Sequence, residues 1–428
     1  MLCASSSSAT DRATELRRTE YAGRVDDENE VDSERYTLIS ADCHAGANMD
    51  TYAGYLDPAW REDFDAWRGA YKNPFRDLQG GGRTRNWDSG RRLSEQESDG
   101  VVAEVIFPNT VPPFFPTGAL VARPPGPEEY PRRLAGIRAH NRWLADWCAE
   151  QPDRRAGIAQ IFLHDVAEAI ADVRWAKEHG LRGGVLLPAV PPDTGYLKPL
   201  YAPDYDPLWR ECQELDVVVN HHSGGGSPDY GPYPAAGVLW IAETTFFSRR
   251  ALTHLLLSGV FERFPRLRFA LTEQGGAWIP PLLDQFDGYH AQMKTGRIGE
   301  LKYGPDEVLP LKPSEYFARN CWVGASFPSP AEAAARYRIG IDRYMWGSDY
   351  PHYESSYPYT REALRRSFAG TEPSELRRVL GANAAELYGF DLDRLAPLAA
   401  AAGPTVGELN EPLATIPTGA SSPAFFRD

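Results

Sequence analysis

The chain has 428 residues, 42% of them hydrophobic and 12% aromatic, which is enough to bury a large core. Its net charge of −14 argues against a nucleic-acid or anionic-membrane partner, because both bind basic surfaces. The five cysteines lie far apart and form no CxxC pair, so neither a disulfide framework nor a cysteine zinc site is indicated.

The predicted elements follow one another from a polar start to an Ala/Pro-rich end. Residues 1–34 are rich in Ser, Arg and acidic residues without apolar periodicity, and we expect a disordered N-terminal arm there. Eight short apolar runs then predict β-strands, at residues 36–44, 101–108, 156–163, 182–188, 216–222, 267–273, 320–327 and 342–352. Longer helical patterns lie between them, at residues 127–150, 165–180, 206–215, 250–265 and 329–340. We expect residues 396–428 to form a loosely packed C-terminal tail.

The alternation of strands and helices predicts a parallel α/β fold. Near-continuous apolar strands are typical of a sheet that is covered on both faces. Eight strands favour a closed barrel over an open sheet, and no GxGxxG follows the first strand. We therefore predict a single-domain (β/α)₈ TIM barrel over residues 35–395, with long loops at the rim where such barrels build their active sites.

Polar residues end four of the predicted strands. Asp42 and His44 end the first strand and share one face, because residues two apart in a strand point the same way. The other three strand ends carry His221 and His222, Glu273, and Asp349 with His352. Side chains at the carboxyl ends of parallel strands can converge on one cation above the barrel. Two carboxylates and two imidazoles suit zinc, manganese or iron better than calcium or magnesium.

Each of these features also has an ordinary structural explanation. Asp42 and Asp349 are residue types that cap turns, and Glu273 is compatible with a surface carboxylate. The pair His221-His222 is compatible with one packed and one solvated histidine. Four such features at the correct ends of four strands together favour a metal site. The chain lacks GxSxG, GxxxxGK[ST] and HExxH, so the serine-hydrolase, P-loop and common zinc-protease patterns are absent.

The segments DCH (42–44), HHSGGG (221–226), LTEQGGAWIPPLLDQFD (271–287) and YMWGSDYPH (344–352) resemble the amidohydrolase-related family. The resemblance covers about residues 36–390 and is closest to the branch of aminocarboxymuconate-semialdehyde decarboxylase and the resorcylate-type decarboxylases. It implies one divalent metal ion held by Asp42, His44, His222 and Asp349, with His221 as the competing assignment for the fifth strand.

Two positions depart from that family pattern. Asp42 stands where many members have histidine, although some decarboxylases of the branch carry a carboxylate there. Glu273 falls where many relatives place a histidine that hydrogen-bonds the metal-bound water. No lysine stands in residues 182–188, so a carboxylated lysine that bridges two metals is not expected, and one ion is.

These residues lead to a ranked set of functions. We expect a mononuclear metal-dependent hydrolase of a small aromatic or cyclic ester, amide or lactone, with Zn²⁺ first and Mn²⁺ as the alternative ion. We expect Asp349, Glu273 and His222 to be the catalytic groups. The residues expected to bind the substrate are His221, Trp278, His352 and Phe107. The first alternative is a non-oxidative decarboxylase of an aromatic or unsaturated acid, in which Asp349 protonates carbon. The second is a metal-free ligand-binding barrel.

The expected partners are a small-molecule substrate and further copies of the chain, because relatives suggest a homo-oligomer. The chain has no apolar run of about 18 residues and no apolar core of a signal peptide near its start. We therefore expect a cytoplasmic protein without a membrane or nucleic-acid partner.

Overall fold

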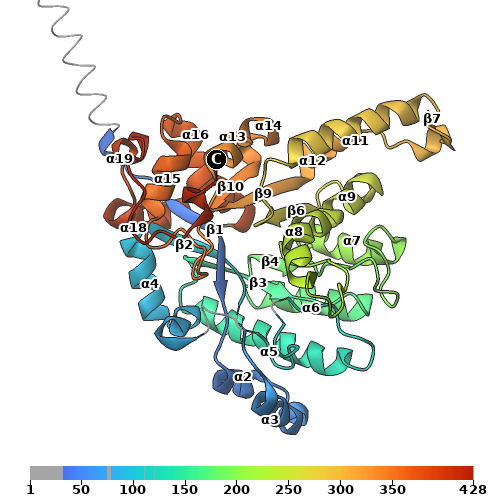
Figure 1. The fold of residues 1–428 in the computed structure, drawn as a ribbon, viewed down its shortest axis with the longest axis horizontal. Coiled ribbons are helices and arrows are strands. Elements are labelled where there is room, and N and C mark those ends of the chain that lie inside the picture. The colour runs from blue at the N-terminus through green and yellow to red at the C-terminus, as the bar shows by residue number, and fades with distance from the viewer. Residues whose placement is uncertain (1–31, 75–78, 110, 120, 428) are drawn as a thin grey trace, which may run out of the picture.

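A computed structural model describes residues 32–74, 79–109, 111–119 and 121–427 (Figure 1). The predicted disordered arm therefore lies almost entirely outside the described residues. Within the described part, strands surrounded by helices form a barrel, which confirms the predicted fold class.

All eight predicted strands are present and run parallel in one sheet. Their order along the sheet equals their order in the chain: β1 (Leu38–Ala45), β2 (Val101–Pro108), β3 (Arg155–Gln160), β4 (Gly184–Leu186), β5 (Val218–His222), β6 (Arg268–Thr272), β9 (Cys321–Ser326) and β10 (Tyr344–Gly347). Sequential parallel strands with helical crossovers are the connectivity of a (β/α)₈ barrel.

The barrel closes where the chain beyond β10 meets β1. The Asp349 N–H donates to the Asp42 carbonyl at 2.8 Å, and the His44 N–H donates to the Tyr350 carbonyl at 2.7 Å. The approach is close enough to require glycine: a Cβ on Gly347 would lie 2.6 Å from the Asp42 Cβ. Closure therefore brings the predicted ligands of the first and last strands together.

Helices surround the barrel between consecutive strands. The five predicted helical segments contain α5 (Tyr130–Ala149), α6 (Val166–Glu178), α7 (Asp206–Glu214), α9 (Arg250–Leu257) with α10 (Val260–Arg263), and α13 (Pro330–Ala334) with α14 (Arg336–Ile339). The chain between β1 and β2 forms α2 (Met49–Tyr55), α3 (Arg61–Ala70) and α4 (Ser89–Ser98). After β10 come α15 (Thr360–Phe368), α16 (Pro373–Arg377) and α17 (Asn383–Tyr388). None of the helices in the described part is both long and apolar enough to cross a bilayer.

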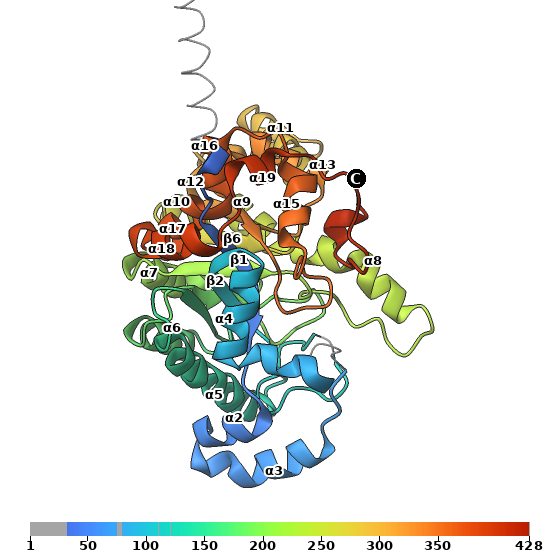
Figure 2. The ribbon, with the colours of Figure 1, turned by 90° about the vertical axis from the view of Figure 1, so that its left-hand side faces the viewer.

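Two long insertions leave the barrel surface. One is α11 (Ile279–Lys294) with the antiparallel pair β7 (Arg297–Ile298) and β8 (Leu301–Lys302), which projects outward before α12 (Pro313–Asn320) returns the chain (Figure 1). The other carries α8 (Ala236–Ser248), which projects on another side of the molecule (Figure 2). Helix α8 exposes Val238, Ile241 and Phe246. The predicted homo-oligomer stays a prediction.

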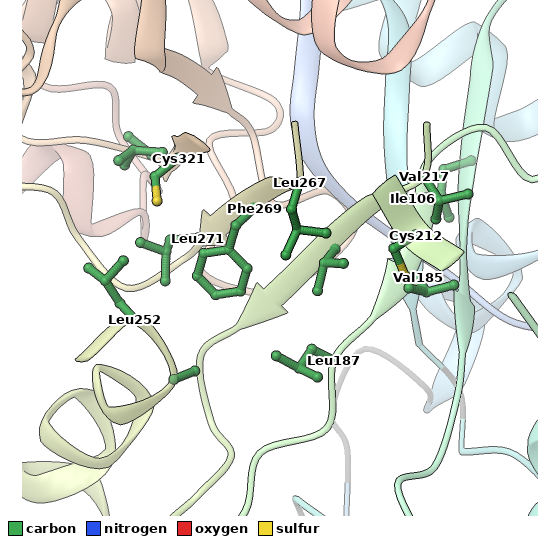
Figure 3. Packing of buried hydrophobic residues seen from close by; sticks show 14 of the residues in the cluster. Ile106, Val185, Leu187, Cys212, Val217, Leu252, Leu267, Phe269, Leu271 and Cys321 are labelled. Carbon is green, nitrogen blue, oxygen red and sulfur yellow. The ribbon is translucent and has the colours of Figure 1, made fainter. Parts of the chain in front are cut away.

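The core has two layers. Small and branched side chains such as Ile39, Val105 and Ile158 fill the barrel interior, and α17 packs against the same cluster. A larger outer layer lies between strands and helices. Figure 3 shows part of this outer layer, with Leu252 of α9 and Leu271 of β6 among its members. Both faces of the strands are buried, which explains their near-continuous apolar sequences.

The C-terminal segment is more tightly packed than its composition suggested. Residues 392–402 form helix α18 (Leu392–Ala402), and α19 (Val406–Asn410) follows. Leu409 and Phe425 are almost completely buried, and the Val406 N–H donates to the Glu34 carbonyl at 2.8 Å. The expectation of loose packing is therefore wrong for this segment, because its few large apolar residues are spaced to face the barrel's helical layer.

Candidate metal centre

The predicted ligands converge at the carboxyl ends of the strands. The His44 Nε2 atom lies 3.3 Å from the Asp42 Oδ1 and 3.2 Å from the Asp349 Oδ1. The His222 Nε2 atom lies 3.5 Å from the Asp42 Oδ1 and 3.1 Å from the Glu273 Oε2. Donor atoms of Asp42, His44, His222 and Glu273 all lie within 4.8 Å of one another.

Unpartnered polar atoms test whether this cluster fits a metal ion. The Oδ1 of Asp42, the Nε2 atoms of His44 and His222, and the Oδ2 of Asp349 are buried and have no hydrogen-bond partner among the described residues. Buried polar atoms are rarely left unpaired, because desolvation without a partner is costly. Carboxylate oxygens and imidazole nitrogens are donors for one divalent cation, and the donor set supports a single such ion.

Neighbouring groups orient the donors. The Ser326 hydroxyl donates to the Asp42 Oδ2, which leaves the other oxygen facing the cluster. The Nδ1 of His44 lies 3.3 Å from the Pro108 carbonyl, and the Nδ1 of His352 lies 2.8 Å from the Asp349 Oδ1. Such outer contacts fix the ring orientation and tautomer of ligand histidines.

A buried ion pair supports the strand that carries the first two donors. Arg92 and Glu104 are nearly inaccessible to solvent, and the Arg92 Nε donates to the Glu104 carboxylate at 2.9 Å. A second guanidinium nitrogen of Arg92 donates to the His44 carbonyl at 2.8 Å. The pair therefore fixes the end of β1 from the side away from the cluster.

Two residues of the cluster have a left-handed backbone. Glu273 has φ of 56° and Asp349 has φ of 62°, which non-glycine residues rarely adopt. Such conformations cost about 1–3 kcal/mol and gather at functional sites. Here they turn both carboxylates back over the barrel at the ends of β6 and β10.

The titration of the cluster reflects its burial and its mixed charges. Burial raises the pKa of Asp42, but the imidazoles of His222 and His44 outweigh burial and hold it below the usual range. Burial lowers the pKa of His44, but Asp349 and Asp42 outweigh burial and raise it. Burial raises the pKa of Glu273, and the two aspartates add to this shift. At Asp42 and His44, the attraction between opposite charges therefore has a larger effect on the pKa than burial has, whereas burial has the larger effect at Glu273.

A cavity of about 1970 Å³ opens above the cluster. Its wall includes His44, His222 and Glu273, together with Trp278 and His352 from the predicted substrate-binding set. The rim loops that follow β2, β4 and β5 form most of the remainder, as the barrel architecture predicts.

The other two predicted substrate-binding residues are placed elsewhere. His221 is buried, and its ring nitrogens lie 3.3 Å from the Leu187 carbonyl and 3.1 Å from the Ser248 carbonyl. Its neighbour His222 points to the cluster, because adjacent strand residues face opposite sides. Phe107 is 1% exposed and packs its ring 4.6 Å from that of His222. Neither residue lines the cavity, so the assignment of both to direct substrate contact is wrong.

Several polar residues that line the cavity were not predicted from the sequence, and Arg133 and Gln160 are two of them. Arg133 lies on α5, and Gln160 ends β3. Arg133 shares the buried face of α5 with Ile137 and Asn141, at intervals of four residues. A charged residue on the apolar face of a predicted helix was the available signal.

An eight-stranded parallel barrel with clustered carboxylates and imidazoles at its C-terminal rim defines a class of metal-dependent barrel enzymes. Residues 41–390 match the amidohydrolase family, so the chain belongs to that family. Within it, the chain falls in the branch similar to aminocarboxymuconate-semialdehyde decarboxylase.

Several similar proteins are named decarboxylases. Gamma-resorcylate decarboxylase of Rhizobium sp. is 27% identical over 243 residues, which cover 53% of this chain and 70% of the relative. The 2-amino-3-carboxymuconate-6-semialdehyde decarboxylase of Dictyostelium discoideum is 24% identical over 311 residues, which cover 71% and 77%. A crystal structure of 5-carboxyvanillate decarboxylase from Novosphingobium aromaticivorans, complexed with manganese, has a TM-score of 0.61 at 19% identity and covers 83% and 96%.

These comparisons correct two expectations. The relatives are decarboxylases, so the hydrolase that ranked first is wrong, and the carboxy-lyase alternative fits better. Zinc as the first ion is not supported, because the similar structures with a named metal contain manganese. The cluster of donors and the enzyme relatives also argue against a metal-free binding barrel.

Proposed function

We propose that the protein is a metal-dependent carboxy-lyase that removes carbon dioxide, without oxidation, from an aromatic carboxylic acid. The observation that carries this proposal is the set of buried, unpartnered donor atoms on Asp42, His44, His222 and Asp349 beneath a large open cavity. The decarboxylase relatives support the reaction class, and their aromatic acid substrates support the substrate class.

Asp42, His44, His222 and Asp349 would hold the ion, with Glu273 beside it. When bound, the cation would supply positive charge that neutralises and orients the substrate carboxylate. We propose Mn²⁺ as the ion, because three of these five side chains are carboxylates and oxygen donors suit it.

Asp349 is the proposed proton carrier. Its carboxylate takes up a proton by way of His352 and donates it to the ring carbon that bears the substrate carboxylate, the carbon–carbon bond breaks, and the released electron pair restores the aromatic ring. The products are carbon dioxide and the arene, and the proton lost by Asp349 is replaced from water. His352 lines the cavity with its Nδ1 2.8 Å from the Asp349 Oδ1, so it can return that proton.

The test is release of carbon dioxide from hydroxybenzoic acids by the Mn²⁺-loaded protein. Asp349→Asn should abolish release while the far-ultraviolet circular dichroism remains that of the wild type. The matched control is Asp229→Asn, because Asp229 is an exposed carboxylate that lines the same cavity outside the donor cluster. An Asp349→Asn variant with wild-type turnover would exclude this residue as the proton carrier.

A further inference from the structure

We propose that Arg133 forms a second anion-binding subsite in the cavity, and that the substrate is therefore an aryl carboxylic acid with a second, distal carboxylate. This inference rests on the proposed function, which places the first carboxylate at the metal centre. It assigns the remote end of the substrate to α5 and the end of β3.

Arg133 is a buried cation without an acidic partner. Its side chain lies on the inner face of α5, and the residue is 5% exposed. No carboxylate of the described residues lies within 4.0 Å of its guanidinium, and its contacts are the rings of Phe115 and Phe162, each 5.8 Å away. The nearby Glu129 pairs instead with Arg132, at 2.9 Å.

The charge at this position needs a partner. Burial lowers the pKa of Arg133 to about 10, which still leaves the guanidinium charged at neutral pH. A buried charge without a counter-ion is costly, and aromatic faces compensate only a part of that cost. A ligand carboxylate would supply the missing charge, and its two oxygens match the paired N–H groups of a guanidinium.

Gln160 adds a second donor to the lining of the cavity. Its backbone is held by Asn141 of α5, whose side chain donates to the Gln160 carbonyl at 2.8 Å and accepts from the Gln160 N–H at 2.9 Å. The side-chain Nε2 of Gln160 is buried and has no hydrogen-bond partner among the described residues. Arg133 and Gln160 both line the cavity, and the described residues provide no carboxylate partner for the N–H donors of either side chain.

The three other arginines of the cavity differ from Arg133. Arg123 pairs with Asp193 at 2.7 Å. Arg249 lies over the ring of Trp278, 4.5 Å from its centre, and is partly exposed. Arg427 is exposed. Burial and the absence of a paired carboxylate together distinguish Arg133 from all three.

The size of the cavity agrees with an extended ligand. Typical small-molecule pockets occupy about 300–1,000 Å³, whereas this cavity measures about 1970 Å³. His44 and His222 of the metal centre and Arg133 all line this one cavity, so a single ligand has access to both.

The experiment compares acids that differ only in the distal carboxylate. Calorimetric dissociation constants are measured on Mn²⁺-loaded protein for salicylate against 4-hydroxyisophthalate, and for 5-phenylsalicylate against 4-hydroxybiphenyl-3,4′-dicarboxylate. In at least one pair, the dicarboxylate should bind about 10-fold to 100-fold more tightly, the range expected for a hydrogen bond to a charged group. Arg133→Met should remove that gain, whereas the affinity of the monoacid stays the same.

Arg132→Met is the matched control, because Arg132 is the next residue of the same helix but is exposed and already paired. It should leave the affinity ratio unchanged. Should Arg133→Met fail to fold, Arg133→Lys is measured instead. Lysine keeps the charge but loses the paired donors, so part of the ratio should be lost.

Three results would overturn the subsite. The first is equal affinity of the wild type for the monoacid and the diacid of each pair, and the second is an Arg133 variant that keeps the wild-type ratio of these affinities. The third is inorganic phosphate that raises the thermal stability of the wild type and competes equally with both acids. The readout is binding, not turnover. If none of the four acids releases carbon dioxide, the proposed function fails, whereas the affinity ratio still reports on Arg133.

Discussion

Replacing Glu104, a buried residue of the barrel strand β2, by glutamine should lower the free energy of unfolding. Glu104 is 1% exposed on β2, and it accepts from the Arg92 Nε at 2.9 Å and from the Gln96 Nε2 at 2.7 Å. Arg155 lies farther away, with its Nε 3.9 Å from the carboxylate. The substitution retains size and one acceptor oxygen but leaves two buried guanidinium groups without their negative charge.

The expected magnitude follows from burial. Removing one partner of a buried ion pair costs ~3–5 kcal/mol, and the retained amide oxygen places Glu104→Gln at the lower end, ~3 kcal/mol. Arg92 also donates to the His44 carbonyl, so a shift of its guanidinium should weaken metal binding as well. The matched control is Glu211→Gln, because Glu211 pairs with Arg174 at 2.7 Å but the Arg174 side chain is 58% exposed. Exposed pairs contribute about 0–1 kcal/mol.

The assay is urea unfolding at neutral pH, followed by circular dichroism, with the metal content of each variant measured in parallel. The free energy of unfolding of Glu104→Gln should fall by several times the loss in Glu211→Gln. Equal losses in the two variants would refute the argument that burial makes the Arg92–Glu104 pair important.

Three further predictions concern pH, metal and packing. Burial raises the pKa of Asp99 to about 7, above its ordinary 3.8, so the folded state binds the proton more tightly and stability falls as pH rises between these values. Asp99→Asn keeps the oxygen that accepts from the Thr360 N–H. Its free energy of unfolding should equal that of the wild type at about pH 4 and exceed it by up to about 4 kcal/mol at about pH 8. A difference in urea unfolding that does not change with pH would contradict this. Chelation of the metal should lower the unfolding free energy by about 3 kcal/mol relative to protein with Mn²⁺ at 100 times its dissociation constant, and identical thermal unfolding of the two forms would count against a bound ion. Gly347→Ala should lower the free energy of unfolding by about 1–3 kcal/mol, because the added Cβ would lie 2.6 Å from the Asp42 Cβ. In the control Gly288→Ala, in α11, the added Cβ has no atom within 4 Å, so this variant should be neutral or stabilising in the same urea assay.

Much of the barrel could be predicted because its determinants are local. Strands buried on both faces need apolar residues throughout, and each of the eight appeared as a short apolar run. The polar ends of β1, β5 and β10 then located Asp42, His222 and Asp349, since parallel strands all finish at one rim. The C-terminal segment was misjudged because its composition does not reveal that Leu409 and Phe425 face the barrel's outer layer.

What the sequence determined by itself was the fold class, the family and the group of polar residues that cluster at the rim, because periodicity and strand-end chemistry depend on near neighbours in the chain. Tertiary structure alone decided which side chains reach the cavity. The tertiary structure buries His221 and Phe107 outside the lining of the cavity and places Arg133 in that lining, although Arg133 is distant in sequence from every residue of the donor cluster. The physical reason is that direct contact depends on how strands and rim loops pack across the barrel, and this packing sets burial and charge pairing between residues that are distant in sequence.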